Sequence, residues 1–107
     1  MSDSGAISPL APTAFPDLPA IAGLEAAVGR AGFYKHDRPD LLLIRCAPGT
    51  RAAGVFTTNA VGSAPTDWCK QALSAARGGV RGLLVNAGCA NSFTGPAGDA
   101  ACKRALT

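Results

Sequence analysis

The residues of this chain that best suit binding chemistry gather in the stretch Asn86-Ala-Gly-Cys-Ala-Asn-Ser-Phe-Thr-Gly95. The side chains of Asn86, Asn91 and Thr94 can donate and accept hydrogen bonds within a short reach of one another. Gly88 and Gly95 permit a positive φ and a close approach of the backbone to a ligand. Such a set suits recognition of the polar ends of an amino acid. We therefore single out Asn91, Thr94 and Gly95 as candidate substrate-binding residues.

A structural role competes with this interpretation. Asn and Thr side chains commonly close turns and cap helix starts through local hydrogen bonds. We expect this role to prevail at Asn91 and Thr94. A nucleotide site is disfavoured, because the stretch contains neither G-x-G-x-x-G nor Gly-Lys-Ser/Thr.

Other reactive side chains indicate neither a metal site nor a cofactor site. His36, the only histidine, lies in the charged turn 35–40 and is expected to be solvated instead of catalytic. The four cysteines, at positions 46, 69, 89 and 102, lack the C-x-x-C spacing of a zinc site. We expect reduced, mostly buried thiols in a cytoplasmic protein.

Composition narrows the class of protein. A chain of 107 residues with 48% hydrophobic residues fits one globular domain. The net charge of +3 comes from 10 basic and 7 acidic residues that form no run or stripe, so nucleic acid is not an expected partner. No apolar run approaches the roughly 18 residues of a membrane span, and the first residues do not resemble a secretion signal.

The polar stretch 86–95 is expected to follow directly after a strand of a sheet. The run at 80–86 contains Leu83-Leu84-Val85 without alternation, which predicts a strand buried on both faces. Apolar residues predict further strands at 41–46 and 53–59, with a hairpin between Leu41 and Thr58. The segment 21–34 mixes helix-favouring alanines with glycines, and its period-two pattern favours a strand.

Two helices complete the predicted elements. The first spans 68–77, with Asp67 as its N-cap, Arg77 at its C-terminal end and Gly78-Gly79 as its stop. The second starts near Gly98-Asp99 and has barely two turns, so it needs a partner to pack on. The expected fold class is α/β in the layered α+β sense. It has a mixed sheet of 41–46, 54–59 and 80–86, with the helix at 68–77 packed on one face.

The chain divides into an arm and a domain. Residues 1–20 form a Pro-rich arm, extended on the surface, with Leu10, Phe15 and Leu18 pinning it to the body. Residues 21–107 form an α/β domain whose last helix is cut short at Thr107. The sequence therefore reads as if more chain should follow.

Three ordered motifs resemble the ornithine acetyltransferase / glutamate N-acetyltransferase family. They are Gly54-Val-Phe-Thr-Thr-Asn59, then Ser63-Ala-Pro65, then Val85-Asn-Ala-Gly-Cys-Ala-Asn-Ser-Phe-Thr-Gly95. The family pattern is G-V-F-T-x-N, A-P and N-x-G-x-A-N-x-x-T-G, and the lead from Ser8 to Ile21 also looks like that of bacterial members. The resemblance covers nearly the whole chain in the right order and spacing.

The resemblance implies part of a self-processing acyltransferase. Members transfer acetyl between N-acetylornithine and glutamate in arginine biosynthesis, and some also use acetyl-CoA. Their precursor cleaves itself before a threonine, whose new amino group serves as base for its own hydroxyl. This chain lacks the family's Lys-Gly…Met-Ala-Thr segment and its Ser-Thr-Gly oxyanion motif, so none of the catalytic residues lies in it. The implied partner is the rest of its own precursor, in a hetero-oligomer of processed chains.

Three hypotheses follow for the function. In the first, the chain is a segment of the acetyl-transferring enzyme and is inactive alone. In the second, it is a small stand-alone structural or binding module of the same origin. In the third, it belongs to an aminopeptidase with the same self-processing chemistry, which needs the same downstream nucleophile. The reading frame beyond codon 107 separates the first from the second.

Overall fold

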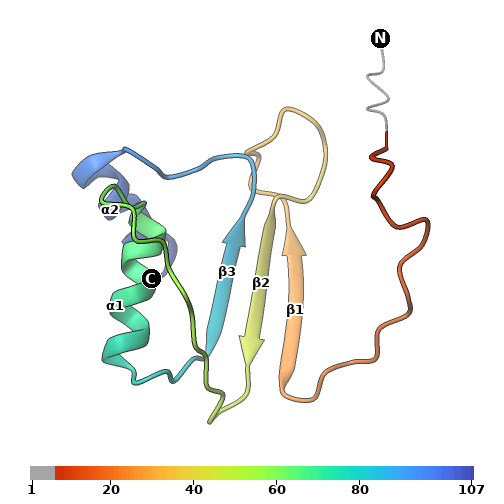
Figure 1. Ribbon diagram of the computed structural model, residues 1–107, viewed down its shortest axis with the longest axis horizontal. Helices are drawn as coiled ribbons and strands as arrows, with labels where there is room; N and C mark the ends of the chain where they lie inside the picture. Colours follow the sequence, from red (N-terminus) through yellow and green to blue (C-terminus); the bar gives the residue numbers. More distant parts are fainter. Residues whose placement is uncertain (1–6) are drawn as a thin grey trace.

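A three-stranded sheet and a pair of helices make up the body of the protein. The computed structural model describes residues 7–107, so the first six residues of the predicted arm lie outside the described residues. The elements run in the order β1 (Leu24–Gly29), β2 (Leu41–Cys46), α1 (Ala64–Ala75), β3 (Gly82–Asn86) and α2 (Gly95–Ala105). In Figure 1 the helices lie beyond the β3 edge of the sheet, and the arm lies on the β1 side.

The sheet is antiparallel, in the order β1-β2-β3. The predicted strands at 41–46 and 80–86 are confirmed, the second starting at Gly82, and the strand favoured within 21–34 is β1. The expected mixed sheet is wrong, because every strand pair among the described residues is antiparallel. The hairpin joins β1 to β2, and Leu24 pairs with Cys46.

The predicted strand at 53–59 is wrong. Within residues 7–107 this segment has no strand partner, and the side chain of Val55 is fully exposed. It runs beside α1, with a ring atom of Phe56 3.2 Å from where a Cβ on Gly54 would lie and the Lys70 ammonium 5.6 Å from the ring centroid. Its β-branched and aromatic residues therefore favour an extended chain, which becomes a strand only where a neighbouring strand supplies hydrogen bonds.

Helix α1 starts earlier than expected. Its N-cap is Ser63, and Asp67 lies in the first turn, where a carboxylate interacts favourably with the helix dipole. Pro65 fits this earlier start, because proline is favoured in the first turn of a helix, where no N–H is needed. At the other end, Arg77 lies outside the helix at φ +48 and Gly78 follows at φ +81, so the predicted glycine stop is confirmed.

Helix α2 also starts earlier, at Gly95 with Pro96 in its first turn, and so has about three turns instead of two. Close backbone contacts join α1 to α2, whereas within residues 7–107 none joins a helix to a strand. The expectation that the first helix packs on a face of the sheet is therefore wrong. The two helices pack on each other beside β3.

One face of the sheet is apolar throughout. Residues directly opposite in an antiparallel pair share a face, and the register places eight apolar side chains together: Leu24, Ala26, Val28, Leu42, Ile44, Cys46, Leu83 and Val85. We call this set the apolar face. Among them only Cys46 is buried, at 7% exposure, while Val28 is 71% exposed. The prediction that 83–85 is buried on both faces is therefore wrong for this chain, where Leu83 and Val85 meet solvent.

The arm and the thiols also differ from expectation. Leu10, Phe15 and Leu18 are exposed and do not pin the arm to the body, and residues 7–20 contain no helix or strand. All four cysteines lie in the described part of the chain and each is a free thiol. Cys89 is exposed and only Cys46 is buried, so the expectation of mostly buried thiols is wrong.

Candidate functional site at one end of the sheet

Two loops meet at one end of the sheet. β1 ends there, β2 begins there and β3 ends there, because the strands alternate in direction. The connection from β1 to β2 is residues 30–40, which we call the arch. The connection from β3 to α2 is residues 87–94, which we call the asparagine loop. The candidate binding residues singled out from the sequence belong to the asparagine loop and its two ends.

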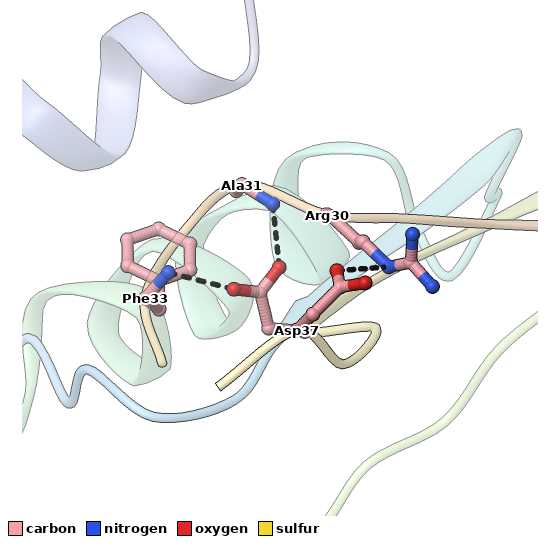
Figure 2. A network of polar contacts seen from close by, with 5 residues as sticks. Arg30, Ala31, Phe33 and Asp37 are labelled. Carbon is pink, nitrogen blue, oxygen red and sulfur yellow. Dashed lines mark hydrogen bonds and ion pairs between the residues drawn. The ribbon is translucent and has the colours of Figure 1, made fainter. Parts of the chain in front are cut away.

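Asp40 is the residue to which other parts of the arch form hydrogen bonds. Its side chain is buried, with the residue 4% exposed, and its carboxylate accepts hydrogen bonds from the amides of Ala31 and Phe33, each at 2.6 Å. Figure 2 shows these two amides turned toward the carboxylate, with the exposed ion pair of Arg30 and Asp37 beside them. The carboxylate thus closes the arch from within, as a buried charge requires.

These hydrogen bonds change the acidity of the carboxyl group. The bond from the Ala31 amide is the largest influence and lowers the pKa of Asp40 below its usual 3.8. Burial acts in the opposite direction, but further amide bonds from the arch, that of Phe33 first among them, add to the lowering. The charged form of Asp40 is therefore the one that the fold favours.

The backbone of Asp40 also connects the arch to the asparagine loop. Its N–H donates to the carbonyl of Gly29 at 3.1 Å, and its carbonyl accepts from the N–H of Ala87 at 2.9 Å. Ala87 is the first residue after β3, so this bond sets the point at which the asparagine loop leaves the sheet. The backbone of Asp40 therefore bonds to the last residue of β1 and to the first residue after β3.

Tyr34 makes the second connection between the loops. A Cβ placed on Gly88, which has φ +91, would lie 2.9 Å from Cε2 of the Tyr34 ring. Only glycine allows both the positive φ and this close approach. The guanidinium of Arg38 lies over the same ring, 4.3 Å from its centroid. The ring of Tyr34 thus packs on the first turn of the asparagine loop.

The polar side chains of the asparagine loop and of the residue before it bond to the loop itself and to the start of α2. Asn86 donates from Nδ2 to the carbonyl of Cys89 at 3.0 Å, and Asn91 donates from Nδ2 to the carbonyl of Gly98 at 2.8 Å. The hydroxyl of Thr94 donates to Oδ1 of Asn91. These bonds match the structural role expected for Asn91 and Thr94 and fasten the loop to the first turns of α2.

Two glycines allow this fastening. Gly95 has φ +58, the left-handed region, with open space around its missing Cβ. Gly98 is buried, and a Cβ there would collide with the Thr94 hydroxyl and with Oδ1 of Asn91. A third anchor comes from a β-bridge between Ser92 and Ser63, the N-cap of α1. The loop is therefore fixed to the arch, to α1 and to α2.

The arch and the asparagine loop together place the candidate binding residues at one end of the sheet. The structure brings Asn91, Thr94 and Gly95 together as the sequence suggested, and it leaves His36 in the exposed bend of the arch. Sequence reasoning missed Tyr34 and Asp40. No signal in the sequence separates a buried aspartate from a solvated one here, because its partners are backbone amides.

Three other kinds of feature bear on function in the described residues: surface depressions, metal-binding clusters and membrane-spanning helices. A surface depression of about 440 Å³ is at the opposite end of the sheet, lined by Glu25, Arg45 and Arg81 among others. Within residues 7–107 no group of three or more His, Cys, Asp or Glu side chains is placed to hold a metal ion. Neither helix in this part of the chain has the length and apolar character to cross a bilayer.

Known proteins share much of this sequence. Arginine biosynthesis bifunctional protein ArgJ of Caulobacter vibrioides is 65% identical over 94 residues, which are 87% of this chain and 23% of that protein. The protein of the same name from Nitrobacter winogradskyi is 48% identical over 102 residues, 94% of this chain and 24% of its own length. The chain thus spans about a quarter of the curated relatives that it matches.

Solved structures share the fold. The crystal structure of ornithine acetyltransferase complexed with ornithine from Mycobacterium tuberculosis aligns with a TM-score of 0.70 at 41% identity, covering 76% of this chain and 42% of that one. The ArgJ structure from Bacillus halodurans aligns with a TM-score of 0.71 at 30% identity, covering 78% and 42%. A model of the ArgJ family matches residues 25–107, from the second residue of β1 through both loops to the last residue. The strands, the arch and the asparagine loop are therefore family features, and the chain belongs to the ArgJ family.

Proposed function

We propose that this chain is the N-terminal part of a glutamate N-acetyltransferase / ornithine acetyltransferase, which moves an acetyl group from N-acetylornithine to glutamate in arginine biosynthesis. In this proposal the chain is inactive by itself. The nucleophilic threonine belongs to the remaining part of the protein, and the two parts assemble as processed chains in the cytoplasm.

The observation that carries the proposal is the match of residues 25–107 to the ArgJ family, together with its share of the relatives' length. The matched segment is 23% of the Caulobacter protein but 42% of each of the two solved chains. The solved chains are thus much shorter than the curated relatives, which supports a protein that functions as two chains.

The exposure of the apolar face supports a missing partner. Small domains that fold alone bury a contiguous core, but among residues 7–107 a single hydrophobic side chain, Cys46, is buried. Leu43, Leu84 and Leu106 line an open depression of about 370 Å³ between the sheet and the end of α2. We assign the remaining part of the protein as the chain that covers these surfaces.

We further place the amino-acid substrate beside the asparagine loop, with Asn91, Thr94 and Gly95 as its nearest residues in this chain. The Mycobacterium tuberculosis relative was solved with ornithine, which supports an amino-acid site in the family fold. Because the side chains of Asn91 and Thr94 are engaged with each other and with Gly98, we propose that they frame the site instead of binding the substrate directly.

A chimaera tests the proposed function. Residues 1–107 replace the matching segment of the Caulobacter vibrioides protein, and ornithine release from N-acetylornithine is measured with glutamate as the acceptor. We expect activity within about tenfold of the parent enzyme, a change of roughly 1.4 kcal/mol in the barrier, and none from the 107-residue chain alone. An inactive chimaera beside an active parent, or turnover by the isolated chain, contradicts the proposal.

The alternative is a stand-alone binding or structural module. The exposed Pro-rich arm is the observation that favours it, since extended proline segments are common ligands of other proteins. A stop codon directly after codon 107 would support the module. A continuing frame that encodes a Lys-Gly…Met-Ala-Thr segment would support the enzyme.

A further inference from the structure

We propose that Tyr34 and Asp40 are positioning residues, which hold the turn at residues 88–90 and, through it, the later part of the asparagine loop beside which the amino-acid substrate is placed above. The proposal rests on the function proposed above and adds the arch to it. Neither residue belongs to the motifs that carry the family resemblance. Their role follows from contacts that only the folded chain brings together.

The turn at 88–90 has few contacts of its own. Within the described residues, the bond from Asn86 to the carbonyl of Cys89 closes it from one side. The bridge at Ser92 and the bonds of Asn91 hold the later part of the asparagine loop and do not reach residues 88–90. The packing of this turn therefore depends on what lies against Gly88.

The ring of Tyr34 occupies the space that a side chain on residue 88 would fill. The three ring atoms nearest to that position lie 2.9, 3.0 and 3.1 Å from it, so the backbone of Gly88 packs directly on the ring. A flat, half-buried ring restricts the turn much as a side chain of its own would. Removing the ring leaves the turn with a glycine at φ +91 and freedom to adopt other conformations.

Asp40 holds the residues next to both the Tyr34 ring and Gly88. Its carboxylate holds the amides of Ala31 and Phe33, and Phe33 directly precedes Tyr34. Its carbonyl holds Ala87, which directly precedes Gly88. Both partners of the Tyr34–Gly88 contact are thus tied to the same residue, one through the side chain and the other through the backbone.

The test uses the active chimaera and measures substrate binding and loop mobility separately. We expect Tyr34→Ala to raise the KM for N-acetylornithine about tenfold while kcat stays within about twofold, because the nucleophile lies outside this chain. Tyr34→Phe keeps the ring, and the Tyr34 hydroxyl has no hydrogen bond within the described residues, so its KM should stay near that of the parent. Lys35→Ala, on the exposed side of the arch, is the matched control.

Hydrogen–deuterium exchange of peptides covering 86–94 gives the second readout. Tyr34→Ala and Asp40→Asn should raise exchange there at least severalfold, and exchange in α1 should not change. Tyr34→Leu replaces Tyr34→Ala if the alanine variant does not fold. A normal KM together with unchanged exchange at 86–94 in a folded variant overturns the inference.

Coupling between the two residues sharpens the test. Gly88→Ala should raise KM in the parent background, since its methyl group meets the ring. The same change should raise KM less in the Tyr34→Ala background, where the ring is gone. Equal effects in both backgrounds count against the contact. An inactive unmodified chimaera contradicts the proposed function alone, because exchange at 86–94 still reports on the arch.

Discussion

The end of the sheet that carries the arch and the asparagine loop, which we call the loop end, differs from the apolar face. At the loop end the side chains have partners within this chain, whereas on the apolar face most do not. At the loop end, the side chains of Asp40, Asn86, Asn91 and Thr94 each make a hydrogen bond within the chain. On the apolar face, side chains such as Val28 remain in solvent. Hydrogen bonds are short-range and can be completed by a few neighbouring residues, whereas apolar burial requires a second layer. The loop end is thus the complete part of this segment, and the apolar face is the part that depends on another chain.

The largest expected effect is a loss of affinity for the rest of the protein when a charge is placed on the apolar face. Ile44, at the centre of the face, is changed to aspartate in the 107-residue chain, and binding to the separately produced remainder of the Caulobacter protein is measured by calorimetry. Burying an unpaired carboxylate costs several kcal/mol, so we expect the affinity to fall by about a hundredfold or more. His36→Asp places the same carboxylate on the exposed arch and should bind normally. Undiminished binding by Ile44→Asp would mean that the apolar face stays open.

Gly95 tests how far the loop end depends on backbone conformation. Its φ of +58 is unfavourable for side chains, and nothing lies near its missing Cβ, so a substitution here adds strain without a collision. Gly95→Val should destabilise the start of α2 by more than the roughly 1–2 kcal/mol typical of an L-residue in this region. Asn visits this conformation readily, so Gly95→Asn should cost much less. Equal urea midpoints for the two variants of the chimaera would contradict this.

Asn91 separates a framing role from direct recognition. Asn91→Ala leaves the Gly98 carbonyl and the Thr94 hydroxyl without their partner, so we expect a stability loss of about 1–3 kcal/mol. The KM of the folded chimaera should change by less than about threefold, since in a framing role the side chain of Asn91 does not contact the substrate and the turn at 88–90 keeps its contact with Tyr34. Ser92→Ala, whose side chain makes no hydrogen bond within the described residues, is the control. Full stability with a fall in kcat/KM would instead show direct recognition by Asn91.

The smallest expected effect is a pH dependence of the arch. The pKa of Asp40 is lowered in the folded protein, chiefly by the Ala31 amide, so the carboxylate contributes stability that is fully present above its ordinary pKa of 3.8. That contribution is lost as the pH falls from about 4 through the folded-state pKa. Exchange of the 31–34 amides should rise in this window in the parent. In Asp40→Asn it should be high already at neutral pH and show no such step.

The sequence predicted the strands better than the helix boundaries. Leu41–Cys46 and the run ending at Asn86 are apolar enough to identify from pattern alone. Both helices start a few residues before their predicted starts, and each has a proline, Pro65 or Pro96, in its first turn, a position that proline suits. The segment 53–59 has the composition of a strand, but its local pattern cannot show that no neighbouring strand is present.

The site was predictable only where its bonds are local. Asn91, Thr94 and Gly98 lie within eight residues of one another, and loop-forming residue types of this kind signal their own hydrogen bonds. Tyr34 and Gly88 are brought together by the sheet, and Asp40 bonds to backbone amides, which every residue except proline possesses. The residue types alone therefore do not predict either contact, although they do predict the turn at 35–40.

The unequal connections between the strands have a consequence for the route by which this segment folds. The arch that joins β1 to β2 is short, whereas the connection from β2 to β3 passes through α1 and is about three times as long. Closing a longer loop costs more entropy, and long-range pairings slow folding. The β1–β2 hairpin is thus the natural nucleus, with β3 adding after α1 has formed. Asp40 would then be in place before Ala87 arrives, so that the hydrogen bond between them completes the sheet as its final step.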